Sequence, residues 1–176
     1  PVFETEISDL AALKELFSIG GSGYLTENIT ADEALQVDSN VALNLSDCVI
    51  DLGGFNITVD TGVSFEVYDS GDTVHYFTPD GSGLWLLDED EGTETVTGGV
   101  ICNGSDVNGG AVYCYGGSFT LNGGNIVGCL AIQGGAIFSY VGSVTINGGS
   151  ILGCLGPDYG GAVFMYGGSL AMNGGT

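Results

Sequence analysis

The chain has 176 residues, and its 22 carboxylates face a single basic side chain, Lys14, so the formal net charge is −21 at pH 7. This charge excludes nucleic acids and other polyanions as partners, because neutralising phosphates requires Lys and Arg. Although 44% of the residues are apolar, no run approaches the roughly 18 consecutive apolar residues of a membrane span, so we expect no membrane insertion. The 33 glycines are interspersed with Val, Ile, Phe and Tyr, which indicates short strands rather than a disordered linker.

Residues 8–17 predict a short amphipathic helix. Ser8 is the expected N-cap, and Gly20 with Gly21 is expected to end the helix. Apolar residues follow the helical spacing at Leu10, Leu13, Leu16 and Phe17. We therefore assign residues 1–23 to an N-terminal helical cap and residues 24–176 to a region of short strands. The first strands of that region are expected at residues 41–45, 49–52, 55–59 and 63–68, between clusters of Gly, Asp and Asn.

Internal repetition in the second half is the strongest signal in the sequence. The segment Gly-Gly-Ala-Val/Ile-Tyr/Phe recurs at nearly equal intervals, starting at Gly109, Gly134 and Gly160. A segment of the type Ser-x-Thr/Ala-x-Asn-Gly-Gly recurs with it, starting at Ser118, Ser143 and Ser169. Residues 93–101 are expected to be a degenerate earlier copy, one repeat length before Ser118.

The length of the repeat selects the fold. Each repeat holds three short β-rich runs separated by glycine turns, too short for a βαβ crossover, and a propeller blade would need about 40 residues or more. Stacking the repeats about 4.8 Å apart pairs each strand with its copy in the next repeat. We therefore expect an all-β fold, a right-handed parallel β-helix with three short strands per coil of about 25 residues, an N-terminal capping helix and an uncapped C-terminal end.

The repeated segments resemble those of large bacterial cell-surface adhesins and polymorphic outer-membrane-type proteins. The resemblance extends from about Tyr24 to the end of the chain, and residues 48–59 are similar to the lead-in of such β-helices. It implies an extracellular location at the cell surface. It also implies partners of the same kind, either other copies or further repeats, with glycans as candidate ligands.

Three functions are considered. The leading hypothesis is a non-catalytic, extracellular structural or adhesive module, and the first alternative is a filament subunit that stacks head to tail. The second alternative is a polysaccharide hydrolase, which needs two carboxylates about 5 to 9.5 Å apart. The carboxylates available for it lie upstream of the clearest repeats, at Asp69, Asp72, Asp80, Asp88, Glu89, Asp90, Glu91 and Glu94. A lyase is disfavoured because Lys14 is the only Lys or Arg side chain that could abstract a proton or neutralise the charge of a uronate.

One acidic run is the candidate metal site. Asp88, Glu89, Asp90 and Glu91 crowd hard oxygen ligands of the kind that Ca²⁺ prefers, although a solvated acidic turn explains the same run. No other cofactor is expected. His75 is the only histidine, and we assign it a structural or surface role.

Four Asn-x-Ser/Thr sequons are candidate glycosylation sites, because they would accept glycans in an extracellular protein. They are Asn28, Asn44, Asn56 and Asn103.

Two aromatic columns are expected along the repeats. One is Tyr113, Phe138 and Phe164, and the other is Tyr115, Tyr140 and Tyr166. If Ala111 and its copies point inward, the rings fill the core. If Val112 and its copies point inward, the rings line an outer face, where they can contact sugars or a neighbouring subunit. The sequence leaves both arrangements open.

Strand alternation orders the remaining repeat positions. Ser118, Thr120 and Asn122 should point outward with their copies and form a hydroxyl-rich surface. The inward rows should be Phe119, Leu121, Val144, Ile146, Leu170 and Met172. Cys129 and Cys154 are equivalent positions, at which a reduced thiol ladder is expected in preference to a strained disulfide.

Overall fold

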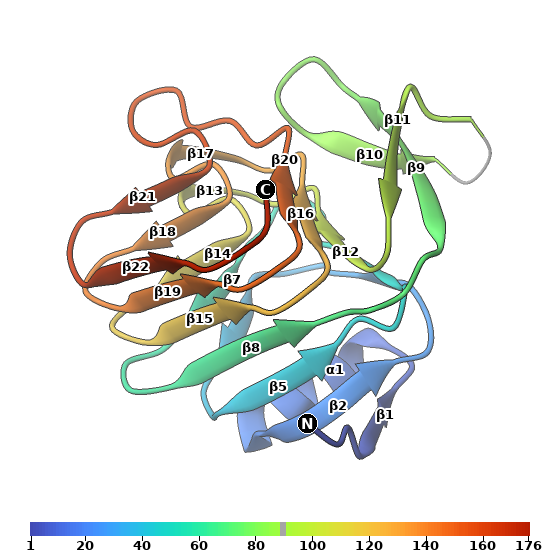
Figure 1. The fold of residues 1–176 in the computed structure, drawn as a ribbon, viewed down its shortest axis with the longest axis vertical. Helices are drawn as coiled ribbons and strands as arrows, with labels where there is room; N and C mark the ends of the chain where they lie inside the picture. The colour runs from blue at the N-terminus through green and yellow to red at the C-terminus, as the bar shows by residue number, and fades with distance from the viewer. Residues whose placement is uncertain (89–90) are drawn as a thin grey trace.

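A computed structural model describes residues 1–88 and 91–176. In these ranges strands account for 47% of the chain and helix for 6%, which confirms the all-β class. The strands lie in stacked layers, with the helix at the N-terminal end of the stack and a small separate sheet on one side (Figure 1).

The helix α1 (Leu10–Ile19) closes the N-terminal end. Its N-cap is Asp9, whose carboxylate accepts a hydrogen bond from the Ala12 backbone N–H at 2.8 Å. The prediction of Ser8 as N-cap is wrong, because Asp9 has the extended backbone and the side-chain bond of a cap. Gly20 ends the helix as expected, with φ at 82° and its N–H donating to the Leu16 carbonyl at 2.8 Å.

Three parallel sheets form the stack. Sheet A has the order β1 (Thr5–Ile7), β2 (Gly21–Leu25), β5 (Val41–Asn44), β8 (Ser64–Tyr68), β15 (Ser118–Leu121), β19 (Ser143–Ile146) and β22 (Ser169–Met172). Sheet B has the order β3 (Ile29–Thr30), β6 (Val49–Asp51), β12 (Val100–Cys102), β16 (Asn125–Val127) and β20 (Ser150–Leu152). Sheet C has the order β4 (Leu35–Val37), β7 (Ile57–Val59), β14 (Val112–Cys114), β18 (Ile137–Ser139) and β21 (Val163–Met165).

Successive strands in the chain visit the three sheets in turn. We call one such set of three strands a layer, so that β2, β3 and β4 form the first layer and β19, β20 and β21 the fifth. The last strand, β22, begins a further layer above β19. The third and fourth layers each carry a fourth short strand, whereas only three strands per repeat were expected. These strands are β13 (Ser105–Asn108) and β17 (Leu130–Gln133), which pair with each other. The expected boundary between the helical cap and the strand region, at residue 23, falls inside β2. Strand β1, which was expected to belong to the cap, pairs with β2 and so is part of sheet A.

The register matches the repeats read from the sequence. Ser118 pairs with Ser143 and Ser143 with Ser169, and the inward residues of β15 and β19 are buried as expected. The core runs through the stack and includes Phe65, Phe119, Leu121, Val144 and Ile146.

The prediction of an earlier repeat copy at residues 93–101 is only partly correct. Val100 pairs with Asn125 as the spacing predicts, but the strand beside β15 is β8, since Ser118 pairs with Ser64. The segment between β8 and β12 is an insertion that forms a separate antiparallel sheet. Its strands are β9 (Val74–Pro79), β10 (Trp85–Asp88) and β11 (Glu94–Thr97).

This side sheet packs on the outer face of sheet B. Phe77 is fully buried, and Phe77, Trp85 and Val96 contact Val100 and Val127. A Cβ added at Gly128 or at Gly153 would lie less than 3.0 Å from Trp85, so the indole lies across two successive layers where only glycine leaves room.

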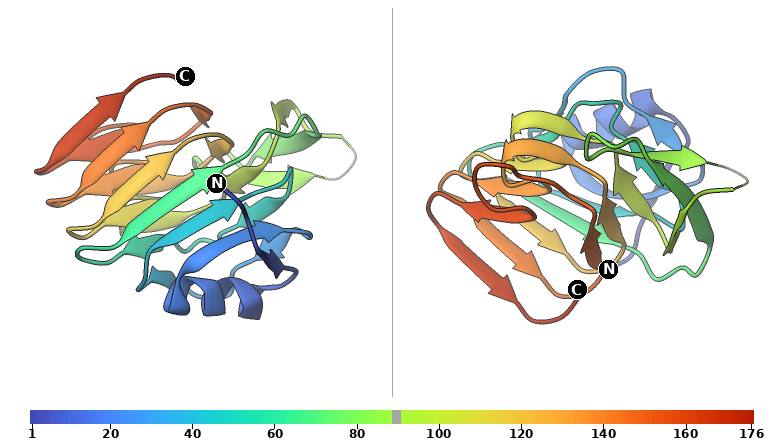
Figure 2. Two further views of the ribbon diagram at one scale, coloured as in Figure 1. Left: turned by 60° about the horizontal axis from the view of Figure 1, so that its bottom comes forward. Right: turned by 90° about the horizontal axis from the view of Figure 1, so that it is seen from above.

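The two ends of the stack differ. At the N-terminal end, α1 buries Leu13, Leu16 and Phe17 against the first layers, and the Phe17 and Phe65 rings lie 5.3 Å apart. At the other end, β20, β21 and β22 are edge strands, and we call the surface they present the open face (Figure 2, left). Leu170 and Met172 were expected inward, but they are 44% and 63% exposed because no further layer covers them.

Candidate functional site

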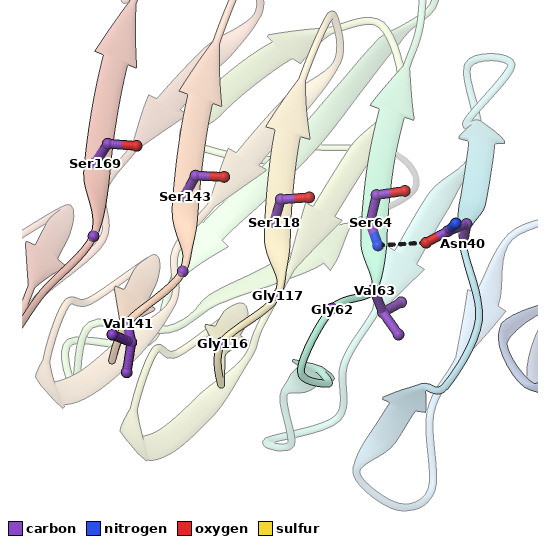
Figure 3. Close-up of a pocket in the computed structure, with 12 residues that line it drawn as sticks. Asn40, Gly62, Val63, Ser64, Gly116, Gly117, Ser118, Val141, Ser143 and Ser169 are labelled. Atoms are coloured by element: carbon purple, nitrogen blue, oxygen red, sulfur yellow. Dashed lines mark hydrogen bonds between the residues drawn. The ribbon is translucent and has the colours of Figure 1, made fainter.

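A groove crosses sheet A where successive layers turn from sheet C into sheet A. It has a volume of about 530 Å³ and runs over residues from five neighbouring layers. One serine from each of four strands lines it, namely Ser64, Ser118, Ser143 and Ser169. The four hydroxyls lie side by side and point the same way (Figure 3), because each serine is the first residue of its strand and the strands are in register. We call these four residues the serine row.

Backbone forms much of the groove between the serines and the turns. A Cβ at Gly142 would lie less than 3.0 Å from the Gly117 carbonyl oxygen, so the stacked turns approach too closely for a side chain at this position. At the N-terminal limit of the groove, the Asn40 side-chain oxygen accepts a hydrogen bond from the Ser64 N–H at 2.9 Å. The groove therefore presents hydroxyl and peptide groups, which suit a polar, uncharged ligand.

The second aromatic column borders this groove. The rings of Tyr115 and Tyr140 lie 5.8 Å apart and those of Tyr140 and Tyr166 lie 5.2 Å apart, with interplanar angles of 17° and 6°. A hollow of about 340 Å³ beside Tyr115 and Tyr140 shares Gly116 and Val141 with the groove. The tyrosine ladder and the serine row thus lie on either side of the same turns.

The first aromatic column lies on the outer side of sheet C, where Phe138 is buried and Tyr113 and Phe164 are partly exposed. Val112 and Cys114 are buried while Tyr113 between them is half-buried and points outward, which selects the outer-face arrangement of the two that the sequence left open. Phe138 follows Tyr113 with ring centroids 5.3 Å apart, and Phe164 follows Phe138 at 5.6 Å. Burial raises the pKa of Tyr113, so this column is a partly covered apolar strip next to the exposed tyrosine ladder.

Stacking limits what the tyrosine ladder can bind. Parallel rings about 5 Å apart use their faces on one another and leave their edges and hydroxyl groups to solvent. Tyr140 therefore offers no free face to a sugar ring, whereas Tyr166 is stacked on one face only and is 68% exposed. Along the ladder, ligand contacts would involve ring edges and hydroxyls.

A ladder of asparagines follows the C-terminal ends of the last strands of sheet A, whereas the serine row lies at the N-terminal ends of those strands. The Asn147 side-chain N–H₂ donates to the Asn122 side-chain oxygen at 2.8 Å, and Asn173 donates to Asn147 in the same way. All bonds of the ladder point from a later layer to an earlier one. The side-chain nitrogen of Asn122 is buried without a hydrogen-bond partner at the start of the ladder.

The sequons differ in their surroundings. Asn28 is exposed, and its side-chain oxygen accepts a bond from the Val49 N–H at 2.8 Å. Asn44 and Asn103 are partly exposed, and the Asn103 amide donates to Asp51 at 2.9 Å. Asn56 is 3% exposed and its amide donates to two backbone carbonyls, so a glycan there would displace buried contacts.

The candidate calcium site lies partly beyond the described ranges. Glu89 and Asp90 fall outside the described residues, while the Glu91 N–H donates to the Asp88 carboxylate at 3.3 Å. Among residues 1–88 and 91–176, no three His, Cys, Asp or Glu side chains are grouped so that they could hold a metal ion.

Several upstream carboxylates organise loops. Asp69 accepts hydrogen bonds from the Asp47 and Gly71 N–H groups at 2.8 and 3.1 Å, at the base of the insertion. Hydrogen bonds from Ser82 hold the pKa of Asp80 below its ordinary value. The His75 side-chain nitrogen lies 2.6 Å from the Asp47 carbonyl oxygen, in keeping with its assigned structural role.

The five cysteines are free thiols. Burial raises the pKa of Cys129 well above its ordinary value, and a hydrogen bond from the Cys129 thiol lowers the pKa of Cys154. The equivalent positions therefore form the expected reduced pair, with no disulfide between them.

Sequence reasoning found the serine and threonine positions but treated them as ordinary surface. The signal for the groove was the repeated Gly-Gly or Val-Gly before Ser118, Ser143 and Ser169, which makes the turns narrow enough to leave a channel. Trp85 was missed altogether. Its signal was the glycine that precedes both Cys129 and Cys154, a small residue on the outer face of sheet B.

Within the described parts of the chain, no helix is long and apolar enough to span a bilayer. Comparisons of the chain with protein-family models, with curated proteins and with solved structures each found no match. The function is therefore inferred from the chain's own residues.

Proposed function

We propose that this chain is a right-handed parallel β-helix that serves as a non-catalytic adhesive module of an extracellular surface protein, with the serine row and the tyrosine ladder as its glycan-binding surface. Each layer would then be one coil of the helix. The observation that carries the proposal is the groove of about 530 Å³ lined by four aligned serines and bordered by tyrosines. Aligned, repeated contacts suit a ligand that is itself a repeating chain.

Charge narrows the ligand class. The groove is lined by serine, glycine, valine and asparagine, with no charged residue, and the net charge of −21 opposes the approach of anionic polymers. Hydroxyl groups of the serine row and of the ladder tyrosines can both donate and accept hydrogen bonds, as sugar hydroxyls do. The expected ligand is thus a neutral linear polysaccharide.

Binding to a panel of neutral and anionic polysaccharides, measured by calorimetry, tests the proposal. We expect a neutral member to bind, and Ser143→Ala combined with Tyr140→Ala to weaken that binding about thirtyfold, since two hydrogen bonds of about 1 kcal/mol each are lost. Thr145→Val is the matched control, because Thr145 lies on the same strand and the same outer face but does not line the groove.

Two results would contradict the proposal. One is a native chain that binds no neutral polysaccharide on the panel. The other is equal binding by the groove variant and the Thr145→Val control, which would place the ligand elsewhere on the surface.

A further inference from the structure

The open face carries groups that are paired on the side of the stack and unpaired on the outer side. We infer that the partner of this face is a further β-layer of this chain's own repeat type, docked parallel and in register. Exposed apolar residues mark the face as an interaction surface. They are Leu155, Tyr159, Tyr166, Leu170 and Met172. Four further features of the open face identify the occupant.

The first feature is a row of unpaired peptide groups. Ser169 and Asn173 donate their N–H groups to the preceding layer, to the carbonyls of Gly142 and Ile146. Because peptide groups alternate in direction along a parallel strand, those of Leu170 and Met172 face away from the stack. An unpaired strand edge of this kind accepts another strand.

The second feature is Gly161, a glycine at a position where nothing in the structure would clash with a side chain. Gly110, Gly135 and Gly161 occupy the same position in three successive layers. A Cβ at Gly110 would lie less than 3.0 Å from the carbonyl oxygen of Gly135, and a Cβ at Gly135 equally close to that of Gly161. At Gly161 nothing lies within 4 Å. A layer stacked on the open face would bring the same carbonyl contact to Gly161.

The third and fourth features are the two ladders, and they give the partner a direction. Tyr166 has one ring face on Tyr140 and the other uncovered, so it matches an incoming aromatic ring. Asn147 accepts a hydrogen bond from Asn173, whereas no side chain among residues 1–88 and 91–176 donates to the Asn173 side-chain oxygen. The incoming layer must therefore bring an amide donor at the asparagine position.

These requirements choose between possible occupants. A second copy docked by its N-terminal end would present α1 and β1, which carry neither ladder. A second copy docked through its own open face would run its strands antiparallel and set one asparagine acceptor against another. A parallel layer of the same repeat satisfies the strand edge, the glycine contact, the tyrosine ladder and the asparagine ladder together.

The experiment extends the chain by a duplicate of its own residues 151–176, appended after Thr176. The Thr176 carbonyl already accepts a hydrogen bond from the Ile151 N–H at 2.8 Å, so Thr176 stands above Ser150 and the duplicate continues in register. The control carries the same added segment with its sequence scrambled. In the extended chain, we expect hydrogen exchange at the Leu170 and Met172 amides to slow at least about tenfold relative to the control.

A substitution sharpens the test. Gly161→Ala should leave the thermal midpoint of the original chain unchanged or slightly higher, and should remove the added exchange protection in the extended chain. Tyr76→Ala, at an exposed tyrosine of the side sheet, is the matched control and should preserve that protection.

Two outcomes would overturn the inference. In one, the ordered and scrambled extensions give equal exchange rates at Leu170 and Met172. In the other, light scattering finds the original chain dimeric with these amides already protected, which would make a second copy the occupant. Neither measurement depends on glycan binding, so the inference and the proposed function can fail separately.

Discussion

At the N-terminal end of the stack, α1 places Leu13, Leu16 and Phe17 over the first layers, and all three are buried. At the open face, Leu170 and Met172 continue inward-facing rows of the same kind and yet contact solvent. The residues at the two ends are equally apolar, so composition does not set their burial. What differs is whether another element lies above them, and in a stacked fold each layer is stabilised chiefly by its neighbours.

The largest expected effect is the difference in unfolding free energy between a substitution at the helix-covered end and one at the open face. Phe17→Ala should lower the free energy of unfolding by about 3–5 kcal/mol, because it empties a fully buried aromatic site against Phe65. Met172→Ala should change it by less than about 0.5 kcal/mol, since the side chain is 63% exposed. Urea denaturation measures both, and similar losses for the two variants would contradict the contrast.

The second prediction compares one glycine position in two layers. Gly135→Ala should cost about 1–3 kcal/mol, because the new methyl group would overlap the Gly161 carbonyl and force the layers apart. Gly161→Ala should be neutral or stabilise the chain by up to about 1 kcal/mol, since alanine restricts the unfolded chain and meets nothing in the folded one. Thermal unfolding of the two variants distinguishes them, and a costly Gly161→Ala in this chain would refute the comparison.

The third prediction concerns pH. Burial raises the pKa of the Cys114 thiol from 9.0 to about 12, so its contribution to stability is complete below pH 9 and is lost as pH rises toward 12. Each such thiol lowers the unfolding free energy by about 1.4 kcal/mol per pH unit within that window. Cys114→Ala should therefore reduce the slope of stability against pH above pH 9.

Cys154 supplies the control for that measurement. Its pKa is lowered by the hydrogen bond from Cys129, so above pH 9 it is ionised in both the folded and the unfolded chain and adds no slope. Cys154→Ala should leave the slope between pH 9 and 12 as it is in the unmodified chain. If Cys114→Ala and Cys154→Ala reduced the slope of stability against pH equally, the pKa values of the two thiols would be raised alike, which would contradict the prediction.

The smallest expected effect lies in the asparagine ladder. Asn147→Ala removes one bond donated to Asn122 and one accepted from Asn173, so it should cost about 1–2 kcal/mol. Asn173→Ala removes one exposed bond and should cost about half as much. Equal effects in urea denaturation would mean that the ladder contributes no more within the stack than at its end.

The repeated half of the chain could be predicted in detail because its signals are local and recur. The spacing of Ser118, Ser143 and Ser169 gave the register of sheet A, and alternation gave the inward rows. The insertion was not predictable in the same way. Residues 93–101 carry a sequence similar to the repeat, and only the tertiary pairing of β8 with β15 reveals that the true partner of Ser118 is Ser64, on the far side of the insertion.

The aromatic columns show a different limit. Ala111 and Val112 are both small enough for a narrow interior, so alternation alone could not say which faces inward and which side Tyr113 occupies. The turn at Gly109 sets the phase of β14 and places Val112 and Cys114 in the core. The groove was missed for a related reason, since it arises from the close approach of turns in separate layers.

The position of Trp85 has a practical consequence. It is the only tryptophan in the chain, and it rests on Gly128 and Gly153, which belong to consecutive layers near the open face. Its fluorescence will therefore report on those two layers selectively. A shift of the emission maximum that precedes the loss of far-ultraviolet circular dichroism would show that the contact between the side sheet and these two layers is lost before the rest of the stack unfolds.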